Sequence, residues 1–277
     1  DFTKILGLMI SNGIVAFASG LYAQYQGFAD INAGRGAIVI GLAAVIIGQV
    51  LFGKIHGNFA FKLTSVALGG VISALNVLCS KGDNVLLHSP TYIGFTHCLT
   101  DNGYHIVHSP LTKDERGVWR MDFADMEKKI VENHIHAAIF CSPHNPCGRV
   151  WERWEIEQAM ALYKKYDVMV VSDEIWSDIL LTGYCHIPTQ SVSEDAKMRT
   201  VALYAPSKTF NLAGLVGSYH IIYNSWLRDR CDKEGSLSHY NAMNVMSMHA
   251  LLGAYRPEGY EWVEELRQVI TGNVDFA

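Results

Sequence analysis

The stretch VMVVSDEIWSDI, residues 168–179, sets the fold of most of this chain. It opens with a short apolar run rich in β-branched side chains and passes directly into acidic and polar residues. A run of this length and composition predicts a β-strand, here over 168–172. The polar residues that follow would then lie in the loop at the carboxyl end of that strand.

Other short β-rich runs surround this stretch and alternate with polar, amphipathic segments. Residues 122–133 and 154–166 are predicted helices, and Asp122 is the predicted N-cap of the first. The other predicted strands are 84–88, 105–109, 137–141, 200–204 and 219–223. This alternation predicts an α/β fold with a mainly parallel, doubly wound sheet. Ligands bind such sheets at the carboxyl ends of the strands, so the residues just after the strands become site candidates.

Charge is distributed unevenly along the chain. The net charge is −5 and no long basic run is present, so nucleic acid is not a predicted partner. Hydrophobic residues make up 49% of the sequence, which is high for a soluble enzyme, and only six charged side chains precede residue 81. This difference in charge content predicts two segments in different environments, one apolar and one aqueous.

Three uncharged runs account for the apolar first part, at 5–29, 36–53 and 63–80. The first two are long enough to be candidates for membrane spans, and 36–53 is apolar on all sides. We therefore expect hydrophobic transmembrane helices there and possible membrane association through residues 1–55. Buried helices of a large soluble protein are the alternative. The third run is less apolar, and for it we expect a soluble core helix.

The six cysteines form no CxxC pair, which is typical of reduced thiols rather than a disulfide framework. Cys141, His144 and Cys147 lie close together in sequence. No second cluster completes a tetrahedral site, so we predict no metal.

Four short segments, each just after a predicted strand, contain the residue types that a pyridoxal-phosphate site requires. They are SPTYIGF with Tyr92, CSPHNPCGRV with Asn145, VVSDEIWSD with Asp173, and YAPSKTFNLAG with Ser207 and Lys208. Each segment alone is a weak signal, because such loops are common. Their order and spacing are much stronger evidence, since Asn145 precedes Asp173 by 28 residues and Asp173 precedes Lys208 by 35.

Each residue type answers one chemical need of that cofactor. The aldehyde needs an amine, which Lys208 offers. The ring nitrogen stays protonated beside a carboxylate such as Asp173. The 3′ oxygen needs a donor, which the Asn145 amide supplies, and the flat ring stacks on an aromatic face such as Tyr92.

The cofactor's phosphate needs backbone N–H groups at a helix N-terminus together with a hydroxyl group. Gly70 and Val71 open the run GGVISALNVL, which we expect to begin a helix. With the Ser207 hydroxyl, they are the predicted phosphate-binding groups.

Residues 71–277 resemble the large domain of fold-type I pyridoxal-phosphate enzymes, the aspartate aminotransferase superfamily. Within it they are most similar to the MalY/PatB group of cystathionine β-lyase-like C–S lyases. The phrases HSPTYIGF, FCSPHNPCGRVW, VVSDEIWSDI and APSKTFNLAGLVGSY carry the resemblance. It implies that Lys208 is the catalytic, cofactor-bearing lysine, that Trp176 lies with Asn145 near the 3′ oxygen, and that the protein is a cytoplasmic homodimer.

The resemblance also implies a reaction, the β-elimination of a sulfur-containing amino acid such as cystathionine. Its products would be a thiol, pyruvate and ammonia. An aminotransferase acting on amino acids is the alternative, and the motifs do not separate the two. Two departures stand out. Cys147 replaces the Thr of the family's usual NPTG turn, and Val216 stands where many aminotransferases have a phosphate-binding Arg.

Residues 1–70 resemble the last membrane segment of an ABC-transporter permease, carried by GLMISNGIVAFASGLYAQYQGFADINAGRGAIVIGLAAVIIGQVLFGKI. The family's small domain and N-terminal arm are absent, and the chain starts at Asp1 rather than Met. We therefore expect two domains, 1–70 and an incomplete 71–277, joined as a chimera near SVALGGVISAL. A permease fragment and an inert fragment are the alternatives to an enzyme.

Overall fold

A computed structural model of the protein describes residues 59–215, 217–238 and 243–277. Residues 59–277 form one compact unit. The predicted membrane helices at 5–29 and 36–53 lie outside the described residues, as does Val216. The predicted core helix at 63–80 is present as α3 (Phe59–Leu78). Among the helices that the structure describes, none is long and apolar enough to cross a membrane.

A single seven-stranded sheet forms the centre of this unit, in the spatial order β3-β2-β1-β4-β5-β6-β7. Its five central strands run parallel, and the edge strands β3 and β7 are antiparallel to their neighbours. The strands are β1 (Asn84–Ser89), β2 (His105–Lys113), β3 (Trp119–Met121), β4 (Ala137–Cys141), β5 (Met169–Asp173), β6 (Thr200–Tyr204) and β7 (Tyr219–Ile221).

The predicted mainly parallel, doubly wound sheet is therefore confirmed, and each predicted strand is present. Strand β2 continues to Lys113, beyond the predicted end at 109. Strand β3 was not predicted, because three residues with an Arg in the middle give no recognisable β pattern.

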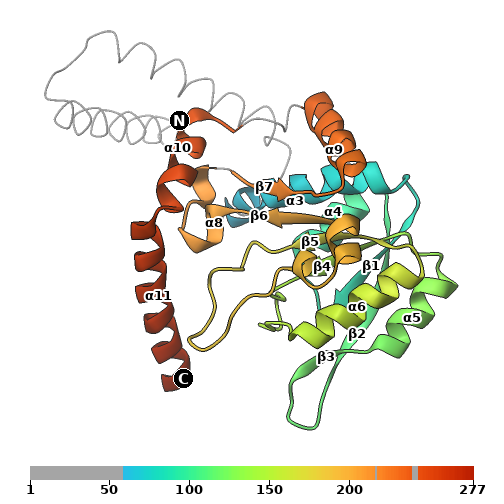
Figure 1. Cartoon of the computed structure of the whole chain (residues 1–277), viewed down its shortest axis with the longest axis horizontal. Coiled ribbons are helices and arrows are strands. Elements are labelled where there is room, and N and C mark those ends of the chain that lie inside the picture. Colours follow the sequence, from blue (N-terminus) through green and yellow to red (C-terminus); the bar gives the residue numbers. More distant parts are fainter. Residues whose placement is uncertain (1–58, 216, 239–242) are drawn as a thin grey trace, which may run out of the picture. The chain divides into compact units, whose positions relative to one another are not determined.

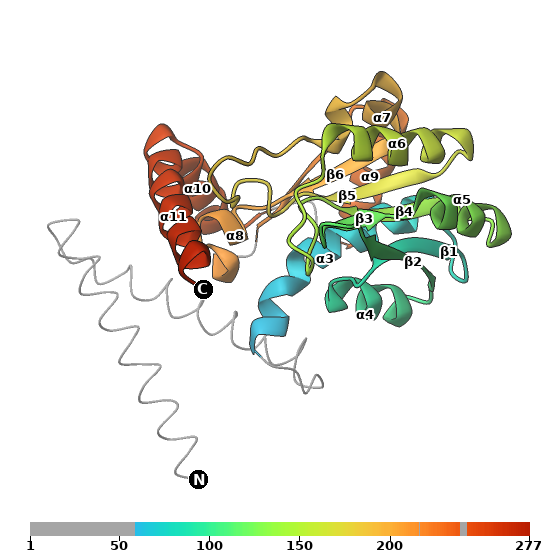
Figure 2. The same ribbon diagram turned by 90° about the horizontal axis from the view of Figure 1, so that it is seen from below.

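Helices cover both faces of the sheet (Figures 1 and 2). Helices α3, α4 and α9 pack on one face, while α5, α6 and α7 pack on the other. The helices that follow α3 are α4 (Ile93–Asp101), α5 (Phe123–Glu132), α6 (Arg153–Lys165), α7 (Glu194–Arg199), α8 (Pro206–Thr209), α9 (Ser225–Ser238), α10 (Val245–Ala254) and α11 (Pro257–Phe276), with 3₁₀ turns η1 (Thr189–Ser191) and η2 (Ala213–Leu215).

The central strands are continuous apolar runs because both of their faces are covered. Every residue of β4 is buried, as are the last four of β5 and the first four of β6. Parallel strands under two helix layers require this pattern. Each fully buried aliphatic or aromatic side chain contributes roughly 1.5–3 kcal/mol to stability.

Local capping explains where the two predicted helices begin. The Asp122 side chain accepts hydrogen bonds from the backbone N–H groups of Ala124 and Asp125, at 3.1 and 3.0 Å, so the predicted N-cap of α5 is confirmed. Helix α6 begins with a reciprocal capping box between Glu152 and Glu155.

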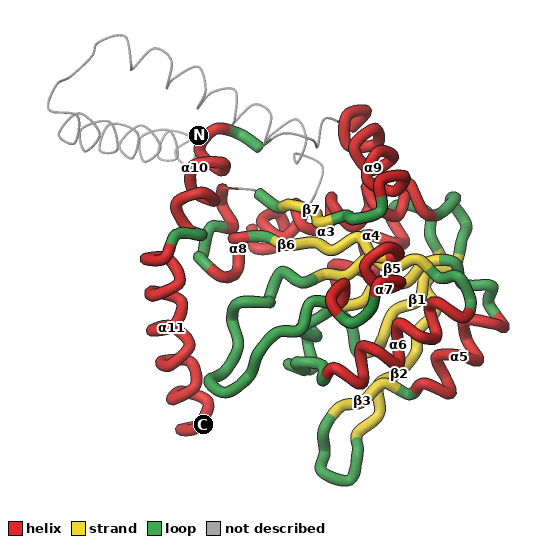
Figure 3. The backbone as a smooth tube through the Cα atoms, viewed as in Figure 1, coloured by secondary structure: helices red, strands yellow, loops and turns green. Residues whose placement is uncertain are grey.

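The four strands whose carboxyl ends matter most, β1, β4, β5 and β6, are parallel neighbours. Their carboxyl ends therefore meet at one edge of the sheet, where the predicted site residues follow them. A long loop leaves this edge after β5 and returns at η1; Figure 3 shows it in green, reaching toward α11.

Candidate active site

Asp173 is the last residue of β5 and lies at the carboxyl edge with only 6% of its surface exposed. One oxygen accepts a hydrogen bond from the backbone N–H of Ile175, at 3.1 Å. Burial raises the pKa of Asp173 to about 6, with a further increase from Glu174, while the Ile175 N–H and the Lys208 cation act in the opposite direction. This carboxylate is buried with few protein partners for its charge.

Lys208 lies in α8, one short turn after β6. Its Nζ atom is 5.6 Å from the centroid of the Trp176 ring, a cation–π geometry. The ammonium is near enough to lower the pKa of Asp173. Within the described part of the chain, the two groups form no ion pair.

Asn145 lies in the turn that follows β4. Its backbone N–H points at the Cys141 sulfur, at 3.4 Å, and the turn is closed by the Gly148 N–H bonding the His144 carbonyl at 2.8 Å. Gly148 has φ of +64°, a left-handed conformation that favours glycine. Neither contact involves Cys147, so the Thr-to-Cys departure leaves this turn closed.

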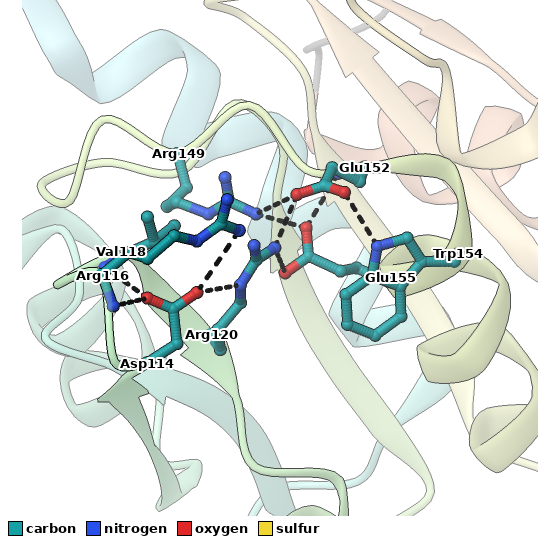
Figure 4. Close-up of polar contacts among 8 residues, drawn as sticks. All are labelled: Asp114, Arg116, Val118, Arg120, Arg149, Glu152, Trp154 and Glu155. Carbon is teal, nitrogen blue, oxygen red and sulfur yellow. Dashed lines mark hydrogen bonds and ion pairs between the residues drawn. The ribbon is translucent and has the colours of Figure 1, made fainter.

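A charge cluster around the fully buried Glu155 includes Arg149, the residue directly after this turn (Figure 4). Arg149 forms an ion pair with Glu155, whose side chain is fully buried. Arg120 on β3 contacts Glu155 at 3.0 Å and Glu152 at 2.7 Å, and also Asp114 at 3.1 Å. The cluster ties the Asn145 turn to α6 and to the β2–β3 hairpin.

Tyr92 and Ser207 also lie at this edge. Tyr92 precedes α4, just after β1, and its half-buried ring meets Phe95 edge-on at 5.5 Å between centroids. Ser207 is the second residue of α8. Its hydroxyl has no hydrogen-bond partner among the residues that the structure describes.

The prediction that Gly70 and Val71 open a helix is wrong. Helix α3 starts at Phe59 and runs through both residues, so their N–H groups lie in a helix interior, where such groups bond carbonyls of the same helix. Val71 is fully buried in the core. A Cβ on Gly70 would lie 2.8 Å from the His220 ring, so Gly70 lets α3 approach β7 closely. The helix N-terminus from which we predicted phosphate binding is therefore not at these two residues.

Sequence reasoning missed a buried network around Glu174. This carboxylate is fully buried and accepts hydrogen bonds from Ser172, Tyr204 and the Thr189 backbone, at 2.9, 2.5 and 3.1 Å. It also contacts His186 at 2.6 Å. Burial opposes ionisation, but these partners together lower the pKa of Glu174 below its usual value. The network fixes the loop after β5 against β6.

Two buried histidines were also missed. His88 on β1 and His144 are each 3% exposed, and burial lowers the pKa of both to about 4. They contact aromatic rings: His88 meets Phe140, and His144 meets Trp151. Both imidazoles are therefore neutral and pack against these aromatic rings in the core.

Cysteine chemistry adds no metal site at this edge. Burial raises the pKa of the Cys141 thiol well above its ordinary value, so it stays a thiol. Across the described residues, no group of three or more His, Cys, Asp or Glu side chains is arranged to hold a metal ion.

The sheet order defines a doubly wound α/β domain, and the buried Asp173 and Lys208 both lie at the carboxyl edge of its parallel strands. The family aminotransferase class I and II matches residues 62–276. The chain belongs to this family.

Individual relatives agree with that assignment. Cystathionine beta-lyase PatB of Bacillus subtilis is 36% identical, over 75% of this chain and 54% of the relative. Protein MalY of Escherichia coli is 30% identical, over 70% of this chain and 49% of its own length. The solved PLP-bound C–S lyase of Staphylococcus hominis is 32% identical, with a TM-score of 0.69, over 76% of this chain and 52% of that one. The chain thus spans about half the length of the relatives it matches.

Proposed function

We propose that this chain binds pyridoxal phosphate through Lys208 and carries out the β-elimination of sulfur-containing amino acids, as a C–S lyase. The observation that carries the proposal is the pairing at the carboxyl edge: a buried carboxylate with few partners, Asp173, and an amine, Lys208, that influences it without contacting it. A pyridoxal ring between them would offer a protonated nitrogen to Asp173 and an aldehyde to the Lys208 amine.

The donor set fits that cofactor at several other points. Trp176 already lies beside the Lys208 amine, and Tyr92 and Asn145 follow the neighbouring strands. The unpartnered Ser207 hydroxyl can donate to a phosphate oxygen. With Gly70 and Val71 inside α3, we assign the phosphate to the hydroxyl and backbone N–H of Ser207, which follows Pro206 in α8.

When bound, pyridoxal phosphate supplies an electron-withdrawing ring that makes the Cα proton of an amino acid acidic. Asp173, as a carboxylate, holds a proton on the ring nitrogen. Lys208, once its amine is free, takes the proton from Cα as a general base. A thiol then leaves from Cβ, and hydrolysis of the remaining three-carbon fragment gives pyruvate and ammonia.

The direct test is covalent trapping. The chain is incubated with pyridoxal phosphate, reduced with borohydride, digested and mapped by mass spectrometry. We expect the label on Lys208, its loss in Lys208→Ala, and its retention in Lys164→Ala, which removes an exposed amine on α6. A label spread over surface lysines, or one that survives Lys208→Ala, contradicts the proposal.

Aminotransferase activity is the second candidate, favoured by the family that the chain matches. The two reactions differ in what they need. Pyruvate released from cystathionine without an added keto acid supports the lyase, whereas turnover that requires a keto acid supports the aminotransferase.

The homodimer that the resemblance implies belongs to the same proposal. The matched segment covers about half the length of the relatives, and sedimentation equilibrium of the purified chain would measure its oligomeric state directly.

A further inference from the structure

We infer that Asp178 and Thr209 form a positioning pair that sets the direction of the Lys208 side chain. The inference rests on the proposed role of Lys208 as the cofactor-bearing amine. It concerns two residues other than the Lys208 amine and Asp173, the predicted partner of the ring nitrogen.

The first step is the weakness of α8 as an isolated element. Helix α8 comprises four residues, Pro206–Thr209, a single turn. A turn of that length does not hold itself, because helix formation becomes favourable only after a costly nucleus. Contacts from outside α8 must therefore fix the orientation of Lys208.

The second step is the contact that does so. Thr209, the residue directly after Lys208, is fully buried, and its hydroxyl donates a hydrogen bond to the Asp178 carboxylate at 3.0 Å. A hydrogen bond to a charged acceptor is stronger than one between neutral groups. This bond joins α8 to the loop after β5, across 31 residues of sequence.

The third step is the rigidity of the turn that carries Asp178. The turn is built directly on the end of β5: the Ile175 N–H bonds Asp173, the Ser177 N–H bonds the Glu174 carbonyl at 3.0 Å, and the Ile179 N–H bonds the Trp176 carbonyl at 3.2 Å. The same turn therefore places Trp176 against Lys208 and Asp178 against Thr209.

The outer part of the loop is fixed as well. Arg267 on α11 donates to the Leu180 carbonyl at 2.8 Å, and the Thr182 N–H bonds the Thr271 hydroxyl at 2.9 Å. Asp178 is thus held from both sides, so it acts as a fixed acceptor against which α8 is oriented. Loss of the Thr209–Asp178 hydrogen bond would let the Lys208 amine change its position relative to Asp173.

The experiment measures how fast pyridoxal phosphate condenses with Lys208, from the rise in visible absorbance, with borohydride mapping to confirm the site. Thr209→Val removes the donor at nearly constant volume, and Asp178→Ala removes the acceptor. We expect each to slow condensation about tenfold or more, since small misplacements carry large rate penalties. The double variant should be no slower than the single ones, and Thr209→Ser should restore the rate.

A second readout needs no cofactor. Hydrogen–deuterium exchange of the backbone amides of α8 should speed up in Thr209→Val and Asp178→Ala and stay at the wild-type rate in Thr209→Ser. The matched control is Thr100→Val, which removes a hydroxyl that bonds within α4, outside the loop after β5. Circular dichroism confirms that each variant is folded.

The outcomes separate this inference from the proposed function. Wild-type condensation rates and exchange in both variants would overturn the positioning pair. So would effects that multiply in the double variant, or an equal slowing in Thr100→Val. An unlabelled Lys208 in the wild-type chain would instead overturn the proposed function, whatever the exchange data show.

Discussion

Asp173 and Glu155 are both buried carboxylates, yet their surroundings differ completely. Glu155 is enclosed by two arginines, and its side chain also caps α6. Asp173 has one backbone donor, and burial raises its pKa to about 6. A carboxylate that serves the fold is supplied with positive charge by the fold itself. Under the proposed function Asp173 serves a ligand, and the fold leaves its charge without an ion-pair partner, at a cost in stability.

The two carboxylates also differ in what their loss should do. Removing a fully paired buried ion leaves its partners uncompensated, whereas removing an underpartnered one relieves a desolvation cost. Glu174, with its four partners, belongs with Glu155 in this respect, although it directly follows Asp173 in sequence. Side-chain alternation along the strand end separates the two neighbours.

The largest effect is expected at Glu155. Glu155→Gln keeps the size but removes the charge that faces Arg120 and Arg149, so the unfolding free energy should fall by about 3–5 kcal/mol. Urea unfolding measures this. Glu157→Gln, on the same helix with an exposed partner at 3.7 Å, is the control and should lose less than about 1 kcal/mol. Equal losses in the two variants would erase the contrast.

Asp173→Asn should show the opposite balance. We expect the affinity for pyridoxal phosphate to drop about a hundredfold, because the amide cannot pair with a protonated ring nitrogen. The unfolding free energy of the cofactor-free chain at pH 7 should stay equal or rise. Absorbance titration and urea unfolding give the two numbers, and Asp167→Asn, at an exposed position, is the matched control. A destabilised variant with normal affinity would reverse the assignment.

The sequence predicted most of the sheet because buried parallel strands must be apolar along their whole length, which makes runs such as 137–141 conspicuous. It also located Asp122, which caps α5. Asn145, Asp173 and Lys208 were located because each lies at or just after the end of a buried strand. The sequence prediction failed at Gly70, where it expected a helix to begin. Residues 59–69 contain no proline and no capping pattern that would separate them from this helix, so α3 begins earlier, at Phe59.

Contacts between distant loops were also beyond its reach. Asp178 was already inside a quoted motif, but nothing local shows that its carboxylate meets Thr209. That contact depends on how the loop after β5 folds back on the end of β6.

The pH dependence of stability tests the comparison between buried ionisable groups with and without partners, here with two histidines. The folded-state pKa of His88 and His144 is about 4, below the ordinary 6.5, so the unfolded chain binds more protons between these values. Stability should therefore be full above about pH 6.5 and fall toward pH 4, by about 1.4 kcal/mol per pH unit for each histidine. Asp173, with its raised pKa, binds a proton first in the folded state and opposes this loss between about pH 6 and 3.8.

Two variants separate these contributions. His88→Phe should flatten the profile between pH 4 and 6.5, whereas Asp173→Asn should steepen it below pH 6. Urea unfolding at a series of pH values gives both slopes. If the two substitutions changed the slope in the same direction, the assignment of opposite proton uptake to the two sites would fail.

The smallest effect is expected at Asp122, a carboxylate that needs neither a ligand nor an ion pair. It accepts two backbone N–H groups at the start of α5, far along the sheet from Lys208. Asp122→Ala should lower the unfolding free energy by about 1 kcal/mol, while Asp122→Ser, which keeps an acceptor, should lose much less. Cofactor trapping on Lys208 should be unchanged in both. A change in trapping would mean that the cap of α5 and the lysine site are coupled, and the separation between carboxylates of the fold and of the site would have to be redrawn.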